Sequence, residues 1–235
     1  MELIMLGTGN AMVTRCYNTC FVLSSGEEYF LVDAGGGNGI FKQLEQAGVP
    51  FTGIREMFVT HAHTDHILGA IWVIRKIATL MSNDKYRGNF IVYGHNEVID
   101  ALRTFCRLTL PGKILKYIDE RIFWGEVKDG TRKEILGLPI CFFDILSTKM
   151  KQFGFRVLLP DGQVLVCLGD EPYNEACKKY VEQADWLLAE AFCLYRDREI
   201  FSPYEKHHST ALDAGRLAEA LGVKHLVLYL SLIHI

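Results

Sequence analysis

The 235-residue sequence predicts an α/β fold built as a single domain, in which strands dominate the start of the chain and αβ units follow. Short apolar runs that end at glycine-rich turns recur along the chain, and such runs are typical of β-strands. Longer segments between them carry apolar residues at helical spacing. Hydrophobic residues make up 49% of the chain, which is enough to bury one core.

The first quarter of the chain predicts a strand, a hairpin, a helix and a further strand. The turn Ser24-Ser25-Gly26 separates two apolar runs, which is a hairpin signature. Gly48 follows a segment of helical spacing and is a typical helix stop. The expected strands cover residues 1–6, 19–23, 28–32 and 56–60, and the expected helix covers residues 39–48.

The remainder predicts alternating helices and strands without an internal repeat or a linker. Asp161-Gly162 is a favourable hairpin turn between two of the strands. Residues 107–135 have a mixed pattern that predicts neither a helix nor a strand. The expected helices cover residues 67–81, 97–106, 173–183 and 209–221. The expected strands cover residues 90–93, 140–145, 153–158, 164–168, 185–190 and the chain from 224 onward.

Composition narrows the class of protein. The formal net charge of −3 argues against a general nucleic-acid binder, although a local basic patch remains compatible with it. The seven cysteines are scattered and mostly lie in apolar contexts, which predicts buried reduced thiols rather than a disulfide framework. We find neither a signal peptide nor a membrane-spanning run, and we therefore expect a cytoplasmic protein without membrane contact.

The strongest chemical signal is the motif His61-x-His63-x-Asp65-His66. Two histidines at positions i and i+2 after a strand point to the same side, because an extended chain has period two. Their imidazoles can therefore bind one cation at ~2.0–2.1 Å. Asp65 and His66 follow where the chain turns into a helix, and they can bind a second cation. Two cations ~3.5–4 Å apart form a clamp for displacement on phosphorus.

The sequence resembles the metallo-β-lactamase superfamily, and within it the ribonuclease Z-like branch. This resemblance implies an α/β fold of the αββα sandwich type, with two mixed sheets flanked by helices. It extends over nearly the whole chain, and the order of the weaker motifs points to the branch. The matching segments are Leu6-Gly7-Thr8-Gly9-Asn10, Leu31 to Gly35, Thr60 to His66, Leu168-Gly169-Asp170, Glu190-Ala191-Phe192 and His208-Ser209-Thr210.

The resemblance also implies a set of metal ligands. His61 and His63 would hold the first metal, Asp65 and His66 the second, and Asp170 would bridge both. Zinc suits these ligands best, with manganese or iron as alternatives. Asp33 is expected to be structural, because a carboxylate at a strand end can brace the metal-binding loop with hydrogen bonds.

Three residues are candidates for catalytic roles, namely Asp65, His208 and Glu190. His208 would lie near the scissile phosphate, where it would stabilise developing charge or assist the leaving group. Glu190 would orient His208, against the alternative of a plain surface residue. Ser209 could be a helix N-cap, and His95 is expected to be a loop histidine.

The sequence departs from the family pattern in two places. Leu146 stands where the pattern predicts a histidine ligand, and Leu230 stands where a second one would follow Tyr229. Residues 230–235 resemble a translated sequencing adapter. We therefore hypothesise that the native domain covers residues 1–229 and continues after Tyr229 with a histidine. Residues 230–235 would then be non-native, and His234 would not be a ligand.

The resemblance implies hydrolysis by a metal-bound hydroxide that attacks phosphorus. One candidate is a ribonuclease Z-like endoribonuclease acting on transfer-RNA precursors, although the chain lacks an obvious Gly/Pro-rich arm for gripping transfer RNA. A phosphodiesterase for small or cyclic nucleotides needs no such arm. A non-catalytic metal- or nucleotide-binding protein of the same fold is the alternative from a different class. A homodimer is expected by analogy with relatives.

Overall fold

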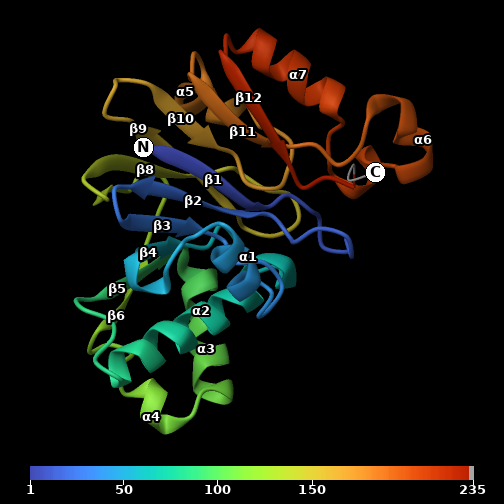
Figure 1. Ribbon diagram of the computed structural model, residues 1–235. Coiled ribbons are helices and arrows are strands. Elements are labelled where there is room, and N and C mark those ends of the chain that lie inside the picture. Colours follow the sequence, from blue (N-terminus) through green and yellow to red (C-terminus); the bar gives the residue numbers. More distant parts are fainter. Residues whose placement is uncertain (233–235) are drawn as a thin grey trace. The chain divides into compact units, whose positions relative to one another are not determined.

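The structure, a computed structural model, describes residues 1–232 (Figure 1). These residues fall into two compact units. Unit 1 comprises Met1–Gly7 and Tyr17–Val127, and unit 2 comprises Thr8–Cys16 and the chain from Lys128 onward. Each unit contains one mixed sheet with helices packed against it.

Unit 1 is built on a sheet whose strands follow the order of the sequence. β1, β2 and β3 are antiparallel neighbours, whereas β3, β4, β5 and β6 run parallel. The hairpin predicted around Ser24-Ser25-Gly26 is therefore confirmed. The strands are β1 (Glu2–Gly7), β2 (Cys20–Ser25), β3 (Glu28–Val32), β4 (Ile54–Phe58), β5 (Phe90–Gly94) and β6 (Ile122–Glu126).

The helices of unit 1 pack on the sheet, with α1, α2 and α3 together (Figure 1). The long helix α2 buries one side against the sheet through residues such as Val73, Ile74 and Ile77, which are completely buried. This apolar stripe removes a large hydrophobic area from water and holds the start of α2 in place. The helices are α1 (Ile40–Gln46), η1 (Phe51–Gly53), α2 (Thr64–Ser82), α3 (Asn96–Thr109) and α4 (Gly112–Leu115).

Unit 2 is built on a second mixed sheet, in the order β12, β11, β10, β9, β8 and β7. The first three of these strands run parallel and the others antiparallel. The predicted turn at Asp161-Gly162 joins β9 and β10. The strands are β7 (Arg132–Ile135), β8 (Leu138–Asp144), β9 (Phe153–Leu158), β10 (Val164–Cys167), β11 (Trp186–Glu190) and β12 (His225–Tyr229).

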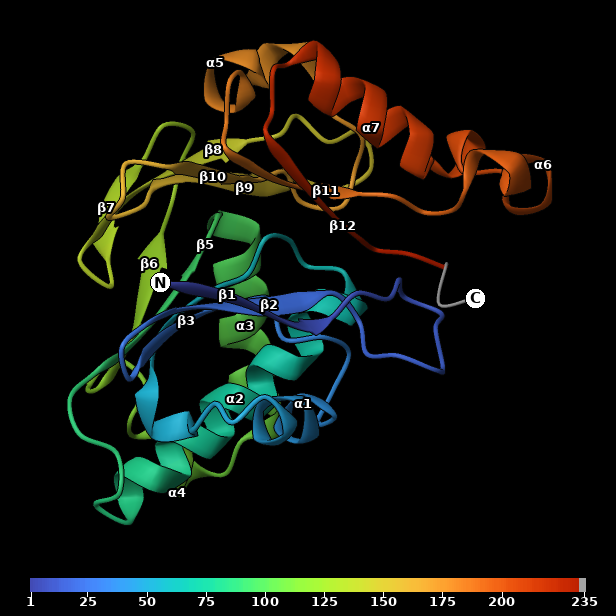
Figure 2. The same ribbon diagram turned by 45° about the horizontal axis from the view of Figure 1, so that its top comes forward.

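In unit 2, α5 and α7 lie over one face of the sheet (Figure 2). Leu187 and Val181 belong to the apolar cluster beneath them. No helix among residues 1–232 combines the length and the apolar character needed to cross a membrane. The helical segments are η2 (Glu175–Cys177), α5 (Lys178–Val181), η3 (Tyr195–Asp197), α6 (Arg198–Phe201), η4 (Tyr204–Lys206) and α7 (Ala211–Ala220).

The predicted helices differ from the observed ones by one to three residues at their ends. The helix predicted over 173–183 begins at Glu175 and ends at Val181. The Asn174 side chain accepts a hydrogen bond from the backbone of Ala176, and Gln183 turns into the left-handed region with φ +59°. The helix predicted from residue 67 begins at Thr64, because the extended residue His63 acts as its N-cap. Residues 107–135, for which the sequence predicted no helix or strand, contain α4, β6 and β7.

Candidate metal centre

Asp33 connects the ends of two neighbouring strands in unit 1. Because β3 and β4 are parallel and Val32 pairs with Phe58, Asp33 lies beside the residues that follow β4. Its carboxylate accepts hydrogen bonds from the backbone N–H of Thr60 (2.8 Å) and from the Thr60 hydroxyl (2.8 Å). Asp33 is buried and has a left-handed φ of +54°, which aspartate tolerates better than most residues. The predicted bracing role of Asp33 is confirmed.

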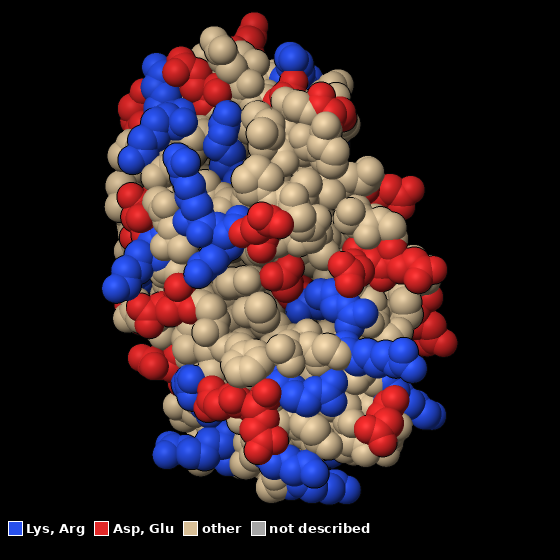
Figure 3. Space-filling model, turned by 90° about the vertical axis from the view of Figure 1, so that its left-hand side faces the viewer, with Lys and Arg blue, Asp and Glu red and all other residues tan. Residues whose placement is uncertain are grey.

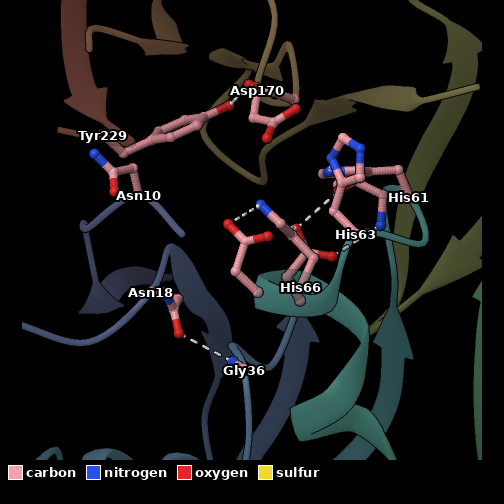
Figure 4. A network of polar contacts seen from close by, with 12 residues as sticks. Asn10, Asn18, Gly36, His61, His63, His66, Asp170 and Tyr229 are labelled. Carbon is pink, nitrogen blue, oxygen red and sulfur yellow. Dashed lines mark hydrogen bonds and ion pairs between the residues drawn. The ribbon is translucent and has the colours of Figure 1, made fainter. Parts of the chain in front are cut away.

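His61 and His63 leave β4 toward the same point, as the period of an extended chain predicts (Figure 4). The Nε2 atom of His61 lies 2.8 Å from the Nδ1 atom of His63. The Thr60 hydroxyl donates to Asp33, so it accepts from Nδ1 of His61 at 2.9 Å. This hydrogen bond places the proton of His61 on Nδ1 and leaves Nε2 with its lone pair.

Asp65 and His66 lie in the first turn of α2, and both are buried. His66 donates through Nδ1 to Asp33 at 2.8 Å. Its Nε2 atom lies 3.5 Å from a carboxylate oxygen of Asp65. Asp33 therefore fixes the tautomers of His61 and His66, directly for His66 and through Thr60 for His61. Outer carboxylates commonly orient metal-binding histidines in this way.

The glycine-rich segment after Asp33 is clamped between α2 and Tyr17. A Cβ atom at Gly69 would lie 1.8 Å from the carbonyl oxygen of Ala34, so only glycine allows this approach. The Tyr17 hydroxyl donates to the carbonyls of Ala34 (2.9 Å) and Gly37 (2.8 Å). Burial raises the pKa of Tyr17 and keeps the hydroxyl protonated as a donor. The sequence analysis did not single out Tyr17, because an isolated tyrosine before a strand carries no distinguishing signal.

In unit 2, Asp170 follows the end of β10 and is buried. Its backbone N–H donates to the Gln152 side chain at 3.2 Å. The Tyr229 hydroxyl donates to the carbonyl of Gly169, and Figure 4 shows this ring directed at the segment that carries Asp170. Gly169 has φ +81°, a conformation that favours glycine and turns the chain sharply after the strand.

Glu190 and His208 meet in unit 2, as predicted. Nδ1 of His208 lies 3.4 Å from Oε2 of Glu190, whose side chain is 1% exposed. The other carboxylate oxygen accepts from the backbone N–H of Ser209 at 2.5 Å. The ring of His208 stacks on Phe192 with an interplanar angle of 4°. Glu190 is therefore buried, and the surface alternative is wrong.

The loop after β8 is organised by Glu171, which the sequence analysis did not single out. The buried carboxylate of Glu171 accepts from the Ser147 hydroxyl (2.6 Å) and from the backbone N–H of Thr148 (3.0 Å). Leu146, by contrast, is half exposed and has φ +57°. The residues after it, Ser147 to Lys149, contact Glu171, the chain neighbour of Asp170.

Several minor expectations are settled. The N-cap of α7 is Thr210, which forms a capping box with Asp213, so the N-cap prediction for Ser209 is wrong. His95 is completely buried at the start of α3 rather than lying in an open loop. Leu230 is buried with φ +59°, and the prediction for His234 lies outside the described residues. All seven cysteines are free thiols, and five of them are buried as predicted, whereas Cys16 and Cys141 are partly exposed.

Burial keeps several of these thiols protonated. It raises the pKa of Cys106 to about 12 and that of Cys177 to about 11. A thiolate is the form that binds metals and attacks electrophiles. These two cysteines are therefore structural.

Comparisons with known proteins place the chain. The family model described as "Anti-Pycsar protein Apyc1" matches residues 1–105. A ribonuclease Z of Bradyrhizobium sp. is 26% identical over 97% of this chain and 88% of its own length. A ribonuclease Z of Thermobifida fusca is 28% identical over 97% of this chain and 82% of its own. The sequence is therefore similar to ribonuclease Z proteins over nearly its whole length.

The predicted fold of the chain is confirmed by a solved structure. The short form of human tRNase Z matches with a TM-score of 0.79 at 22% identity, covering 98% of this chain and 93% of that one. The metallo-β-lactamase fold protein YhfI from Bacillus subtilis also matches, with a TM-score of 0.77 at 19% identity, covering 97% of this chain and 85% of that one. The predicted class, two mixed sheets flanked by helices in the metallo-β-lactamase fold, is therefore correct. The Bradyrhizobium alignment extends over 273 residues, whereas this chain has 235. That relative therefore contains insertions that this chain lacks.

Proposed function

We propose that this protein is a metal-dependent hydrolase that cleaves phosphodiester bonds. The observation that carries the proposal is the hydrogen-bond network of Asp33, which fixes both His61 and His66 with a lone pair on Nε2. Histidines without a ligand role need no such arrangement. The ribonuclease Z relatives support the hydrolase class.

The side chains of unit 1 suit divalent cations. Two nitrogen or oxygen ligands of one tetrahedral cation lie ~3.3 Å apart when each is ~2.0–2.1 Å from it. His66 Nε2 and Asp65 Oδ2, at 3.5 Å, are close to this spacing. His61 Nε2 and His63 Nδ1, at 2.8 Å, need to separate by a few tenths of an ångström. Imidazole with carboxylate favours zinc, and manganese or iron are the alternatives.

The roles of the residues follow from this arrangement. We assign His61 and His63 to a first metal, Asp65 and His66 to a second, and Asp170 to both, the last on the resemblance to the family and on its buried place after β10. Bound divalent cations would neutralise the phosphoryl oxygens and make a water acidic enough to attack phosphorus. His208, oriented by Glu190, would assist the leaving group.

The surface favours a small or short substrate over a long RNA. On the face in Figure 3, positive and negative side chains are interspersed rather than gathered into one field. The Lys and Arg side chains of residues 107–135 are exposed, apart from the half-buried Arg121, which donates to the carbonyls of Tyr86 and Gly88. The insertions of the Bradyrhizobium relative are also missing here. A small or cyclic nucleotide is therefore our first candidate, and RNA is the second.

A homodimer stays a prediction.

Two variants test this proposal together, with bis-p-nitrophenyl phosphate as the substrate. We expect His61→Ala to lose bound metal and all turnover while keeping the fold, because the first metal loses a ligand. We expect His208→Ala to keep its metal and to lower kcat by ~10²–10⁴-fold. Elemental mass spectrometry, circular dichroism and steady-state kinetics provide the readouts. Undiminished turnover by His61→Ala contradicts the metal mechanism.

A further inference from the structure

Lys149 lies beside His208, and neither the sequence motifs nor the names of the relatives give this lysine a role. Its ammonium nitrogen lies 3.2 Å from Nε2 of His208. That nitrogen is the outward one of the ring, because Nδ1 faces the buried Glu190. His208 is thus placed between a carboxylate on one side and a cation on the other.

The backbone of Lys149 is fixed rather than part of a loose loop. Its N–H lies 3.3 Å from a carboxylate oxygen of Glu171, and Ser147 and Thr148 bind the same carboxylate. The Ser147 hydroxyl accepts a further hydrogen bond from the Lys149 N–H at 3.3 Å. A buried acid thus anchors three consecutive residues of the loop. Lys149 starts from a defined position, which lowers the entropy lost when its side chain binds a ligand.

The charge of Lys149 is not neutralised by a neighbouring acid. The Glu171 carboxylate is occupied by the loop, and within residues 1–232 Lys149 forms no ion pair with a carboxylate. An ammonium group has three protons, and one of them suffices for the contact with His208. The other two remain available to an anion.

Two other lysines of unit 2 differ from Lys149 in this respect. The Lys206 ammonium donates to the carbonyl of Phe201 at 2.8 Å and lies over the ring of Phe192. Lys178 lies within 4 Å of Glu175 and Glu182. Lys149, unlike these two lysines, has donors to spare and lies directly at the histidine.

We propose that Lys149 and His208 form an anion site that binds a phosphoryl group. The ammonium binds a phosphoryl oxygen with its remaining protons, next to Nε2 of His208. Charge-assisted hydrogen bonds of this kind are stronger than neutral ones. Only the identity of the natural ligand rests on the proposed function. The site itself is tested by anion binding. Lys149 then positions the scissile phosphate against the histidine.

The test uses the full chain with its metals and inorganic phosphate as the probe. We expect Lys149→Met to raise the Kd for phosphate, measured by calorimetry, about tenfold, which is the effect of losing one charge-assisted contact. The KM for bis-p-nitrophenyl phosphate rises in parallel, with a smaller change in kcat. Lys149→Arg keeps the charge and stays within about threefold of the wild type. Lys178→Met removes the same charge from an already paired lysine and leaves phosphate binding unchanged.

The outcomes separate this inference from the proposed function. A Kd for phosphate in Lys149→Met within twofold of the wild-type value overturns the anion site, even if turnover depends on metal. If Lys149→Met binds phosphate more weakly and the wild-type protein hydrolyses no phosphodiester, the anion site is supported and the proposed function is overturned. Lys149 is exposed, so both substitutions are compatible with folding.

Discussion

At the scale of single residues, Asp33 has the widest influence on the candidate metal centre. One buried carboxylate binds the backbone and the hydroxyl of Thr60 and the ring of His66. An acceptor with two oxygens is needed, because three donors converge on it. The sequence predicted this bracing role from the position of an aspartate at a strand end before glycines.

We expect Asp33→Asn to weaken zinc binding by ~10–100-fold, as is typical when a carboxylate behind a metal-binding histidine is changed. The asparagine amide presents an N–H₂ group where one of the carboxylate oxygens now accepts, so one hydrogen bond is replaced by a clash of donors. Zinc affinity is measured by competition with a chromophoric chelator. Asp185→Asn, which changes an aspartate that accepts from Lys224, is the matched control. Equal zinc affinities for both variants contradict the bracing role.

Other residue-level features were beyond the reach of the sequence. The sequence analysis placed Leu146 in the position of a missing ligand, but the structure puts Ser147 to Lys149 beside Glu171. Glu171 belongs to the segment Gly-Asp-Glu-Pro, whose composition is typical of a turn. Its role arises from contact with a loop more than twenty positions earlier in the chain, which no local pattern encodes.

At the scale of elements, the start of α2 determines where Asp65 and His66 lie. The sequence predicted this helix from residue 67, because its apolar stripe begins there. The structure starts it at Thr64, with His63 as an N-cap without a side-chain hydrogen bond. Asp65 and His66 therefore have helical geometry, and Asp65 lies in the first turn, where the helix dipole favours a negative charge. Helix ends are the part of an element that periodicity defines least well.

The close packing of α2 on the Asp33 loop gives an element-level prediction. We expect Gly69→Ala to lower the free energy of unfolding by about 1–3 kcal/mol, because the new methyl group would overlap the Ala34 carbonyl. Zinc affinity falls with it, since the loop carrying Asp33 must shift. Urea denaturation and zinc competition measure the two effects.

The control for this substitution is Gly215→Ala in α7. No atom lies within 4 Å of a Cβ at Gly215, so the added methyl group is free of overlap. Alanine favours helix over glycine by up to ~1 kcal/mol, and we expect a modest gain in stability. A gain in stability for Gly69→Ala as well shows that α2 does not constrain the loop.

At the scale of the whole molecule, the order of the motifs predicted the fold class correctly. The predicted strands coincide with strands of the two sheets, whereas β6 and β7 lie in a segment that was not assigned. The parallel strands β3 and β4 place Asp33 beside Thr60, and β11 and β12 run parallel in the other sheet. The segments 107–135 and 191–208 were not assigned, because short strands and single helical turns carry little periodicity. The extent of the domain, residues 1–229 with a non-native tail, stays a prediction.

The measurement that tests the central claim most directly is metal-dependent turnover by the wild-type chain. Metal content is determined by elemental mass spectrometry, and hydrolysis of bis-p-nitrophenyl phosphate is followed before chelation, after chelation and after zinc or manganese is restored. We predict bound divalent metal, loss of turnover on chelation and its recovery on adding metal back. Full turnover in the metal-stripped protein, or no turnover in the metal-loaded protein, contradicts the account, and the second result favours a binding role for this fold.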